Sequence, residues 1–595
     1  FKRIISDSGP DAIAGISSAR TPNEENYLMQ KLMRAIVGTN NIDCCARVCH
    51  SPTALGMQRA FGTGAATNSI EDLDKTEAIF LFGANPTEAH PVTGAKIKQL
   101  FMKGITSIVV DPVETKLAKL AKYHLQLRPG TNVAILNMIS HYIIKENLIN
   151  QDFIDNHTEY YNEFKEHVIN LDMNELEILT GVSKELVKNA AIAYATANNA
   201  MEFHGLGVTE HYQGSKTVML LSNLAMMTGN IGRQGVGLNP LRGQNNVQGA
   251  ADMGVQPHQG AGYLDITKPE IQEYYAKKYG VEKMPEFEGL KIPEMIDSAL
   301  NEKFKALWIM GEDTLMTDPN SNHIRSGFEK LDLLVVQELF MSATAEMADV
   351  VLPASSYFEK NGTFTNGERR VQRVNKVVEP IGNTRADGQI MIDIMGKMGY
   401  KQPTGEVYDA AKLLTEISDV IPFMKGITWN RLGENGLQWP VAEDGTDTQM
   451  LHKGGEFKKG KGKFHNFDFE ESPELLEHRA KFPFILTTAR QLEHYNSGTM
   501  TRRTDNQQLS PQDYLEINPL DAGKKGLSEG DTVKISSDRG SVNIPIRLNY
   551  TVKPGVVRTT FHQPDVFINI ITGNVGDKET LTPEYKVVAV DFEKI

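Results

Sequence analysis

The chain contains 595 residues, a length that allows roughly three to five domains around substantial cores. It is 40% hydrophobic and 23% charged with a formal net charge of -13, and it has no run of about 18 apolar residues, so we expect a globular protein without a membrane span. The densest basic stretch, residues 458–463, is too small to neutralise a nucleic-acid backbone, and we expect no nucleic-acid partner.

The predicted elements begin in the middle of a helix, because residues 1–5 have the pattern of a last helical turn that breaks at Ser8-Gly9-Pro10. Short apolar runs bounded by turn residues then predict buried parallel strands, with helical patterns of about 10–15 residues between them. The clearest runs are residues 78–83, 108–112, 306–311 and 333–337. This alternation is typical of doubly wound α/β sheets, in which ligands bind beyond the carboxyl ends of the strands.

The last part of the chain has a different pattern. From about residue 478, short alternating strands such as residues 532–535 and 542–546 are separated by glycine-rich turns, which predicts a mostly β, barrel-like domain. We therefore predict the α/β class, with two doubly wound, Rossmann-like domains and a C-terminal barrel. The first α/β domain is discontinuous (1–45 and 246–440), the second is inserted into it (46–245), and a linker (441–477) leads to the barrel domain (478–595).

All three cysteines, Cys44, Cys45 and Cys49, lie within six residues and cannot cross-link a multidomain chain, so we expect a reducing compartment, the cytoplasm. A segment upstream of Phe1 could still carry an export signal. The spacing fits neither a paired CxxC zinc site nor a thioredoxin-type CxxC, and buried structural cysteines are one interpretation. The other is functional, because the thiolate and imidazole of Cys49-His50 suit a soft metal ligand beside a proton acceptor.

Residues 239–249 combine amides and glycines around one arginine. Such a loop can simply satisfy backbone groups, but Arg242 can also offer a guanidinium fork to a small carboxylate while the amides hold a polar heterocycle. The glycine-rich segments 204–209 and 228–233 can cradle phosphates through backbone N–H groups, or they can be ordinary turns. Neither is a P-loop, because no Gly-Lys-Ser/Thr follows.

Taken in order, these segments resemble the formate dehydrogenase catalytic subunits of the dimethyl-sulfoxide-reductase family of molybdopterin enzymes, and the likeness covers essentially the whole chain. The matching motifs are Gly38-Thr39-Asn40-Asn41 before Cys49-His50, and residues 241–249 (LRGQNNVQG), 348–353 (ADVVLP), 362–366 (GTFTN) and 582–586 (TPEYK). The resemblance implies oxidation of formate to carbon dioxide at a molybdenum or tungsten ion held by two molybdopterin guanine dinucleotides.

The resemblance also implies site residues. Cys49 matches the metal ligand, His50 the histidine that accepts or relays the formate proton, and Arg242 the arginine that holds the formate carboxylate. The cofactor-binding positions of one α/β domain, together with one from the motif at residues 241–249, are Gly83, Asn85, Asp111, Gly130, Gly205, Gly207, Gly229, Asn230 and Gln244. Those of the other domain are Gly311, Glu312, Asp313, Gln337, Thr344 and Asp387. Arg490, His494, Asn569 and Tyr585 lie in the C-terminal domain, which in the family closes over the cofactor.

Two features depart from the family. The chain has no cluster-binding cysteine set, so we expect a 4Fe-4S cluster only in an upstream segment or on a partner, with an iron–sulfur, NAD(P)- or ferredoxin-linked protein taking the electrons. Cysteine also replaces the selenocysteine of some relatives, which we expect to slow turnover. Two alternatives are a reductase of a small oxyanion such as nitrate, and a non-catalytic scaffold homologue of a respiratory complex subunit. The placement of His50 and Arg242 argues against the first, and the joint presence of Cys49, His50 and Arg242 against the second.

Overall fold

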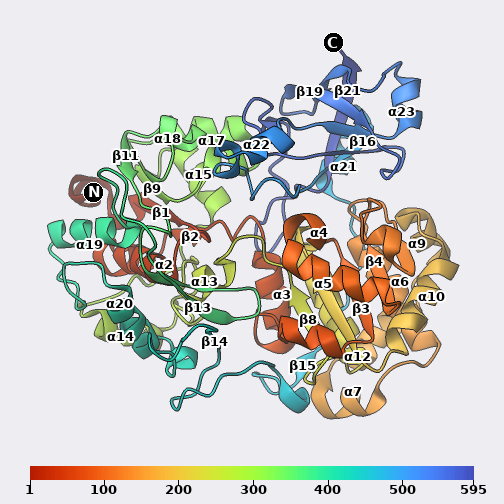
Figure 1. The fold of residues 1–595 in the computed structure, drawn as a ribbon, viewed down its shortest axis with the longest axis horizontal. Helices are drawn as coiled ribbons and strands as arrows, with labels where there is room; N and C mark the ends of the chain where they lie inside the picture. The colour runs from red at the N-terminus through yellow and green to blue at the C-terminus, as the bar shows by residue number, and fades with distance from the viewer. The chain divides into compact units, whose positions relative to one another are not determined.

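A computed structural model describes residues 1–595, and the chain divides into two compact units, which we describe separately (Figure 1). The first unit comprises residues 1–47 and 244–449, and the second comprises residues 48–243 and 450–595. The chain therefore leaves the first unit within the cysteine segment and returns to it directly after the segment that carries Arg242. Cys49, His50 and Arg242 all belong to the second unit.

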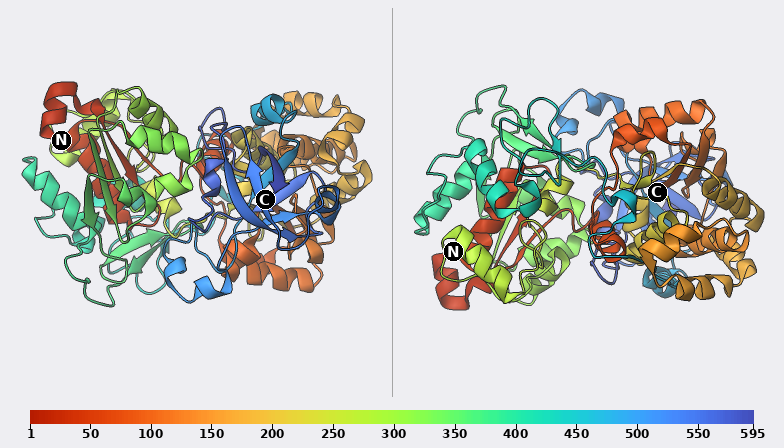
Figure 2. Two further views of the ribbon diagram at one scale, coloured as in Figure 1. Left: turned by 90° about the horizontal axis from the view of Figure 1, so that it is seen from above. Right: turned by 90° about the horizontal axis from the view of Figure 1, so that it is seen from below.

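A five-stranded parallel sheet forms the centre of the first unit, in the order β11-β10-β9-β1-β2. The strands are β1 (Ile13–Ser17), β2 (Ile42–Cys44), β9 (Ala306–Met310), β10 (Leu333–Glu338) and β11 (Val350–Pro353). Strand β1 pairs with β9 from the middle of the chain, and Figure 2 shows the red N-terminal strands beside green ones. Every residue of β9 is buried, which explains its uninterrupted apolar sequence.

Helices cover this sheet. Helices α2 (Asn23–Lys31) and α19 (Asp387–Lys397) share an apolar core with side chains from β1, β2, β9 and β10, while α15 (Ile292–Leu300) packs against α17 (Ser321–Phe328). A small antiparallel sheet contains β12 (Gly362–Thr365), β13 (Arg370–Val374) and β14 (Leu437–Gln438). Other helices of this unit include α1 (Lys2–Ser8), α13 (Val247–Asp252), α14 (Pro269–Tyr279) and α20 (Ala410–Val420). Helix α1 agrees with the helical turn predicted at the start of the chain.

The second unit has its own five-stranded parallel sheet, in the order β5-β4-β3-β7-β8. The strands are β3 (Ala78–Phe82), β4 (Thr106–Val110), β5 (Tyr123–Leu125), β7 (Ala200–His204) and β8 (Gly237–Pro240). The main surrounding helices are α3 (Ser51–Phe61), α5 (Pro91–Met102), α6 (Asn132–Lys145), α10 (Lys184–Ala195) and α12 (Gly214–Met227). The predicted linker contributes to this unit's core, because Phe457 and Phe464 are buried in it.

A closed six-stranded barrel, in the order β16-β20-β17-β19-β18-β21, occupies the C-terminal part of the second unit. Its strands are β16 (Phe484–Thr488), β17 (Leu515–Ile517), β18 (Thr532–Ser536), β19 (Ser541–Leu548), β20 (Val556–Thr559) and β21 (Val588–Lys594). Buried and exposed residues alternate along β18 and β19, as expected for strands with one face in a barrel interior. The barrel and the two parallel sheets confirm the predicted fold class.

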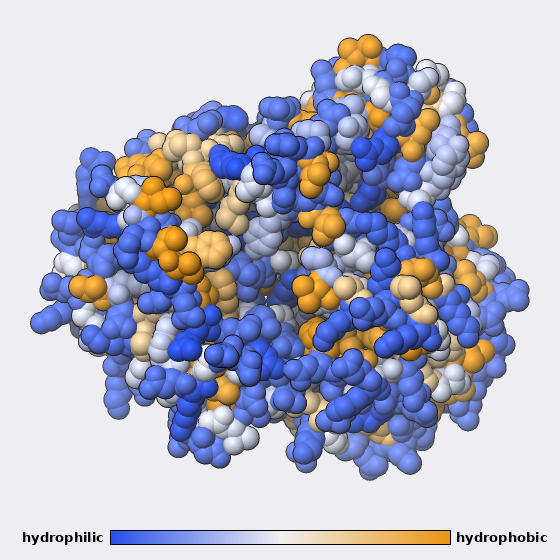
Figure 3. All heavy atoms as spheres, viewed as in Figure 1, coloured by the Kyte–Doolittle hydropathy of each residue, from blue (hydrophilic) through white to orange (hydrophobic).

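On the face drawn in Figure 3, hydrophilic residues predominate and hydrophobic ones form scattered groups. None of the helices combines the length and the apolar character needed to cross a membrane.

Candidate functional site

Cys49 lies in the turn that leads into α3, and it is only 6% exposed. Its side chain belongs to a small apolar cluster with Val48 and Tyr585, against which Leu206 packs. The hydroxyl of Thr209 donates a 2.6 Å hydrogen bond to the backbone carbonyl of Cys49. The turn that carries the cysteine is therefore held by the short helix α11 (Leu206–Thr209), which follows β7.

Both ring nitrogens of His50 have partners. Nε2 lies 3.1 Å from the carbonyl oxygen of Leu241, and Nδ1 lies 3.1 Å from Oγ1 of Thr53. A carbonyl only accepts, so the hydrogen of the neutral imidazole is on Nε2, and Nδ1 accepts from the hydroxyl of Thr53. Burial, together with the positive charge of Arg242, holds the pKa of His50 well below its usual range. His50 is therefore a neutral imidazole whose only basic nitrogen is Nδ1.

Arg242 follows β8 and is 7% exposed. Its Nη2 donates a 2.9 Å hydrogen bond to the carbonyl of Gly64, and its own carbonyl lies 2.7 Å from Nε2 of His90. The carbonyl of the preceding Leu241 is the partner of His50. The structure therefore brings together His50 and the segment of Arg242, although 191 residues separate His50 from Leu241 in the chain.

A cavity of about 260 Å³ opens at the carboxyl ends of β3, β4 and β7 in the second unit. Gly83, Asn85, Asp111, Gly205 and Gly207 line it, together with Arg490 from the loop after β16. Gly130 lies next to Pro129, which also lines the cavity. Six predicted residues from four loops thus meet around one space.

The floor of this cavity depends on glycine. A Cβ atom on Gly83 would lie 2.5 Å from the backbone carbon of Gly207, and one on Gly207 would lie 2.7 Å from Cα of Gly83. The backbone of Gly83 also has φ +55°, a conformation that favours glycine. Any side chain at these positions would push the two loops apart and fill the cradle.

The charges around the cavity suit a nucleotide. Lys116, Arg558 and Lys586 line it beside Arg490, so cations that could neutralise phosphates face the same space as the carboxylate of Asp111. Burial raises the pKa of Asp111 to about 7, against the opposing effect of its hydrogen bond from the backbone N–H of Val113. These three cations were not among the residues predicted for the site. Two of them could have been predicted from the sequence. Lys116 comes shortly after the predicted strand at residues 108–112, and Lys586 is the last residue of the TPEYK motif.

Other predicted residues of the second unit lie elsewhere. The side chain of Asn230 accepts a hydrogen bond from the N–H of Ala200 at the start of β7, which is the amino edge of the sheet, opposite the cavity. Gly229 has φ +67° in the turn after α12. Gly229 and Asn230 thus lie at the opposite edge of the sheet from the cavity, and their role in cofactor binding stays a prediction. His494 holds the carbonyl of Ser510 through Nε2 at 2.8 Å, and Asn569 accepts from the hydroxyl of Thr572 at 3.2 Å.

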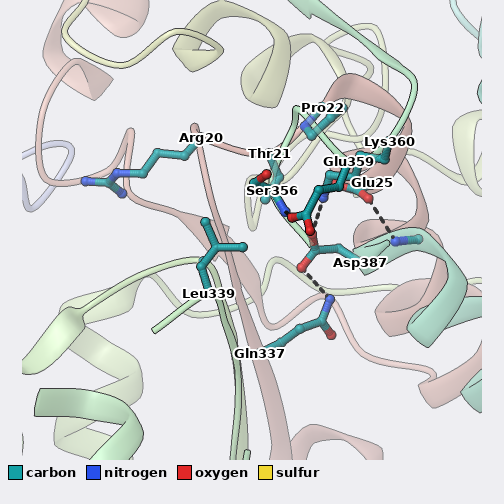
Figure 4. A network of polar contacts seen from close by, with 12 residues as sticks. Arg20, Thr21, Pro22, Glu25, Gln337, Leu339, Ser356, Glu359, Lys360 and Asp387 are labelled. Atoms are coloured by element: carbon teal, nitrogen blue, oxygen red, sulfur yellow. Dashed lines mark hydrogen bonds and ion pairs between the residues drawn. The ribbon is translucent and has the colours of Figure 1, made fainter. Parts of the chain in front are cut away.

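In the first unit, two predicted residues meet in a buried polar network (Figure 4). Nε2 of Gln337 donates a 2.7 Å hydrogen bond to Asp387, and Lys360 makes ion pairs with Asp387 and with Glu25, the latter at 2.8 Å. The amide oxygen of Gln337 is buried and has no hydrogen-bond partner. An unpartnered buried acceptor at the carboxyl end of β10 fits a ligand that supplies a donor there.

The remaining predicted residues of the first unit follow β9. Glu312 accepts hydrogen bonds from Ser18 at 2.8 Å and from Arg20 at 2.6 Å. Asp313 accepts from the backbone N–H and the hydroxyl of Thr344, at 3.0 and 2.8 Å. Gly311 (φ +65°) donates its N–H to the carbonyl of Gln337, and Nε2 of Gln244 lies 3.9 Å from Sγ of Cys45. These residues share the carboxyl edge of the first sheet, where ligands of such sheets bind.

Comparison with known proteins identifies the class. Residues 1–397 match the molybdopterin oxidoreductase family, and residues 484–589 match the molydopterin dinucleotide binding domain. The chain belongs to the molybdopterin oxidoreductase family. Its cofactor is therefore a pterin dinucleotide complex of molybdenum or tungsten.

Its relatives include formate dehydrogenases. The chain is 40% identical to the F420-dependent formate dehydrogenase 1 subunit alpha of Methanococcus maripaludis, covering 99% of this chain and 87% of that protein. It is 42% identical to the F420-dependent formate dehydrogenase subunit alpha of Methanocaldococcus jannaschii (98% and 86% covered) and 37% identical to formate dehydrogenase H of Escherichia coli (99% and 82%). Among solved structures, acetylene hydratase from Pelobacter acetylenicus has the same fold, with a TM-score of 0.76 and 19% identity over 100% of this chain and 88% of that one.

Proposed function

We propose that this chain is the catalytic subunit of a formate dehydrogenase, which oxidises formate to carbon dioxide at a molybdenum or tungsten bis(molybdopterin guanine dinucleotide) centre. The observation that carries the proposal is the contact between His50, which follows Cys49, and the backbone of the segment that presents Arg242. The formate dehydrogenases named above, which match nearly the whole chain, support the same substrate.

Three residues have distinct roles in this proposal. Cys49 supplies a thiolate ligand, which suits a soft metal. Arg242 grips the two oxygens of formate with two parallel N–H groups, and its fixed charge compensates the single negative charge of the ion. His50 takes up the proton at Nδ1, since Nε2 already carries the hydrogen held by the carbonyl of Leu241. When bound, the metal–pterin group accepts the two electrons.

The residues present fit two dinucleotide ends. The cavity of the second unit would hold one, with cations toward the phosphates and Asn85 and Asp111 toward the base. The carboxyl edge of the first sheet would hold the other, with Gln337 and Asp387 among its contacts. The electrons would leave through a 4Fe-4S cluster in a further segment or partner, to an iron–sulfur, NAD(P)- or ferredoxin-linked carrier. A cytoplasmic location is part of the proposal, since three cysteines within six residues are not a disulfide framework for a multidomain chain.

The test is an anaerobic assay of the purified protein for formate-dependent reduction of a viologen dye, with elemental analysis and measurement of the guanosine monophosphate released by acid. We expect formate oxidation together with one molybdenum or tungsten and two guanosine monophosphates per chain. Protein that contains this cofactor but reduces nitrate instead, with no formate oxidation, would overturn the proposal.

A further inference from the structure

Two imidazoles hold consecutive backbone carbonyls at the end of β8. Nε2 of His50 lies 3.1 Å from the carbonyl oxygen of Leu241, and Nε2 of His90 lies 2.7 Å from that of Arg242. Because carbonyl oxygens only accept, each ring carries a hydrogen on Nε2. The two peptide groups that flank the α-carbon of Arg242 are thus each fixed by a side chain.

The guanidinium is fixed as well. Nη2 of Arg242 donates to the carbonyl of Gly64 at 2.9 Å, and the N–H of Leu241 donates to the carbonyl of His204 at 2.8 Å. A side chain as long as arginine loses much rotamer freedom when it is held at both ends. The position of the guanidinium is therefore sensitive to the backbone contact that His90 makes.

The backbone of His90 is held in place by its neighbours. It lies between α4 (Pro86–Ala89) and α5, its N–H donates to the carbonyl of Pro86, and its carbonyl accepts from the N–H of Gly94. A Cβ atom on Gly94 would lie 2.5 Å from the carbonyl oxygen of Pro86, so the two helices meet without room for a side chain. The turn that carries His90 is held on both sides.

The side chain of His90 does not cap the helix that it precedes. His90 occupies the N-cap position of α5, yet its imidazole makes no capping hydrogen bond. It reaches instead across 152 residues of chain to Arg242. The imidazole of His90 therefore serves a distant segment of the chain and not the end of its own helix.

We propose that His90 is a positioning residue that orients Arg242 for the substrate by holding its backbone carbonyl. The inference rests on the proposed function, because that function assigns the carboxylate of formate to Arg242. Either the neutral or the protonated imidazole would serve, since both keep a hydrogen on Nε2.

Three variants test this role. His90→Leu removes the donor, whereas His90→Gln keeps an N–H donor near the position of Nε2. His141→Leu is the matched control, because His141 is a buried histidine of the same unit that does not line the cavity and whose Nδ1 lies 3.1 Å from the carbonyl of Val168. Each variant is purified with its cofactor, and metal and pterin content are measured before kinetics.

We expect His90→Leu to raise KM for formate about tenfold while kcat changes less than threefold, and to weaken inhibition by azide in parallel. His90→Gln should restore both values to within about threefold, and His141→Leu should leave both unchanged. A variant that loses the cofactor while the residual holoenzyme keeps the parental KM would overturn the proposal and make His90 a cofactor contact. The same KM in His90→Leu and His141→Leu, with full cofactor, would also overturn it.

A second measurement does not depend on formate. Hydrogen–deuterium exchange of the peptide that spans residues 238–244 should be faster in His90→Leu than in the parent and His90→Gln, whatever substrate the enzyme uses. If the parent fails to oxidise formate but the exchange result holds, the proposed function fails and the positioning of Arg242 stands. Unchanged exchange in His90→Leu would refute the positioning role itself.

Discussion

Oγ1 of Thr53 lies 2.9 Å from Nε2 of His204 and 3.1 Å from Nδ1 of His50. The hydroxyl has one hydrogen, which it donates to His50, so it accepts from the N–H of His204. The remaining ring nitrogen of His204, Nδ1, is buried and has no partner. Burial, together with Arg242, lowers the pKa of His204 to about 3, so this ring is neutral too. One arrangement of hydrogens therefore accounts for all three hydrogen bonds that link Leu241, His50, Thr53 and His204, and it leaves Nδ1 of His204 without a partner.

Replacing Thr53 by Val should lower kcat for formate oxidation about 10- to 100-fold, because the basic nitrogen of His50 loses the hydroxyl that orients it. Thr53→Ser keeps the hydroxyl and should stay within a few-fold of the parent. Thr217→Val is the control, since the hydroxyl of Thr217 bonds only to Gln213 of its own helical segment. Steady-state kinetics at equal metal content decide the matter. If Thr53→Val and Thr217→Val lose the same activity, the hydroxyl of Thr53 does not orient His50.

Replacing Arg242 by Lys should leave pterin and metal in place but remove most of kcat/KM for formate. Losing a bidentate, charge-assisted contact in a desolvated pocket costs about 2–5 kcal/mol, or roughly 30-fold to several-thousand-fold. Inhibition by azide should weaken in the same variant. Loss of cofactor with normal formate kinetics in the residual holoenzyme would make Arg242 a pterin anchor instead.

Replacing Gly207 by Ala should reduce the amount of cofactor that copurifies with the protein. The new methyl group would lie 2.7 Å from Cα of Gly83, so the loops after β3 and β7 must separate. Gly523→Ala is a suitable control, because a Cβ atom there would meet no atom within 4 Å. The guanosine monophosphate released per chain by acid reports the outcome. Equal amounts from both variants would show that the cradle is not needed for binding.

Replacing Glu202 by Gln should make the protein more stable at alkaline pH. Burial raises the pKa of Glu202 to about 8 from 4.5, against the opposing effect of the 2.6 Å hydrogen bond from Tyr194. The folded state therefore holds the proton more tightly, and stability is lost as pH rises from 4.5 to about 8. Above the folded-state pKa, the free energy of unfolding is lower by roughly 5 kcal/mol than it is below the unfolded-state pKa.

Urea-induced unfolding at about pH 5 and about pH 8.5 tests this difference, since both proteins share every other titrating group. Glu202→Gln cannot ionise, so its advantage over the parent should grow from pH 5 to pH 8.5. Parallel pH dependence in the two proteins would mean that Glu202 is ionised, or equally solvated, in the folded state.

Local patterns in the sequence predict much of this fold. Apolar runs mark β3, β4, β9 and β10 because parallel strands are buried on both faces, and alternation marks β18 and β19. Cys49-His50 and Arg242 stand out because their chemistry is unusual for a loop. The pairing of β1 with β9 is not visible in either segment alone, since it depends on contacts between distant parts of the chain.

The supporting residues of the site were harder to find for the same reason. His90 contacts Arg242, and Thr53 contacts His204, each across more than 100 positions of the chain. Thr53 also contacts His50, three positions away, but no local pattern marks its hydroxyl as a partner of that ring. Asn230 shows the opposite case. Its glycine-rich segment has the composition of a phosphate loop, whereas its side chain accepts a hydrogen bond from the first amide of β7, at the amino edge of the sheet. Composition alone does not distinguish the two edges.

The most direct test of the proposed function is formate-dependent dye reduction by Cys49→Ala and Cys44→Ala, each measured with its molybdenum or tungsten content. Cys44 is buried in the apolar core of the first unit, and burial raises the pKa of its thiol far above the usual range, so we expect a packing role for it and choose it as the control. Cys44→Ala should cost about 1–3 kcal/mol of stability and keep formate oxidation within a few-fold of the parent. Cys49→Ala should abolish it. Formate oxidation by Cys49→Ala within a few-fold of the parent would contradict the proposed site.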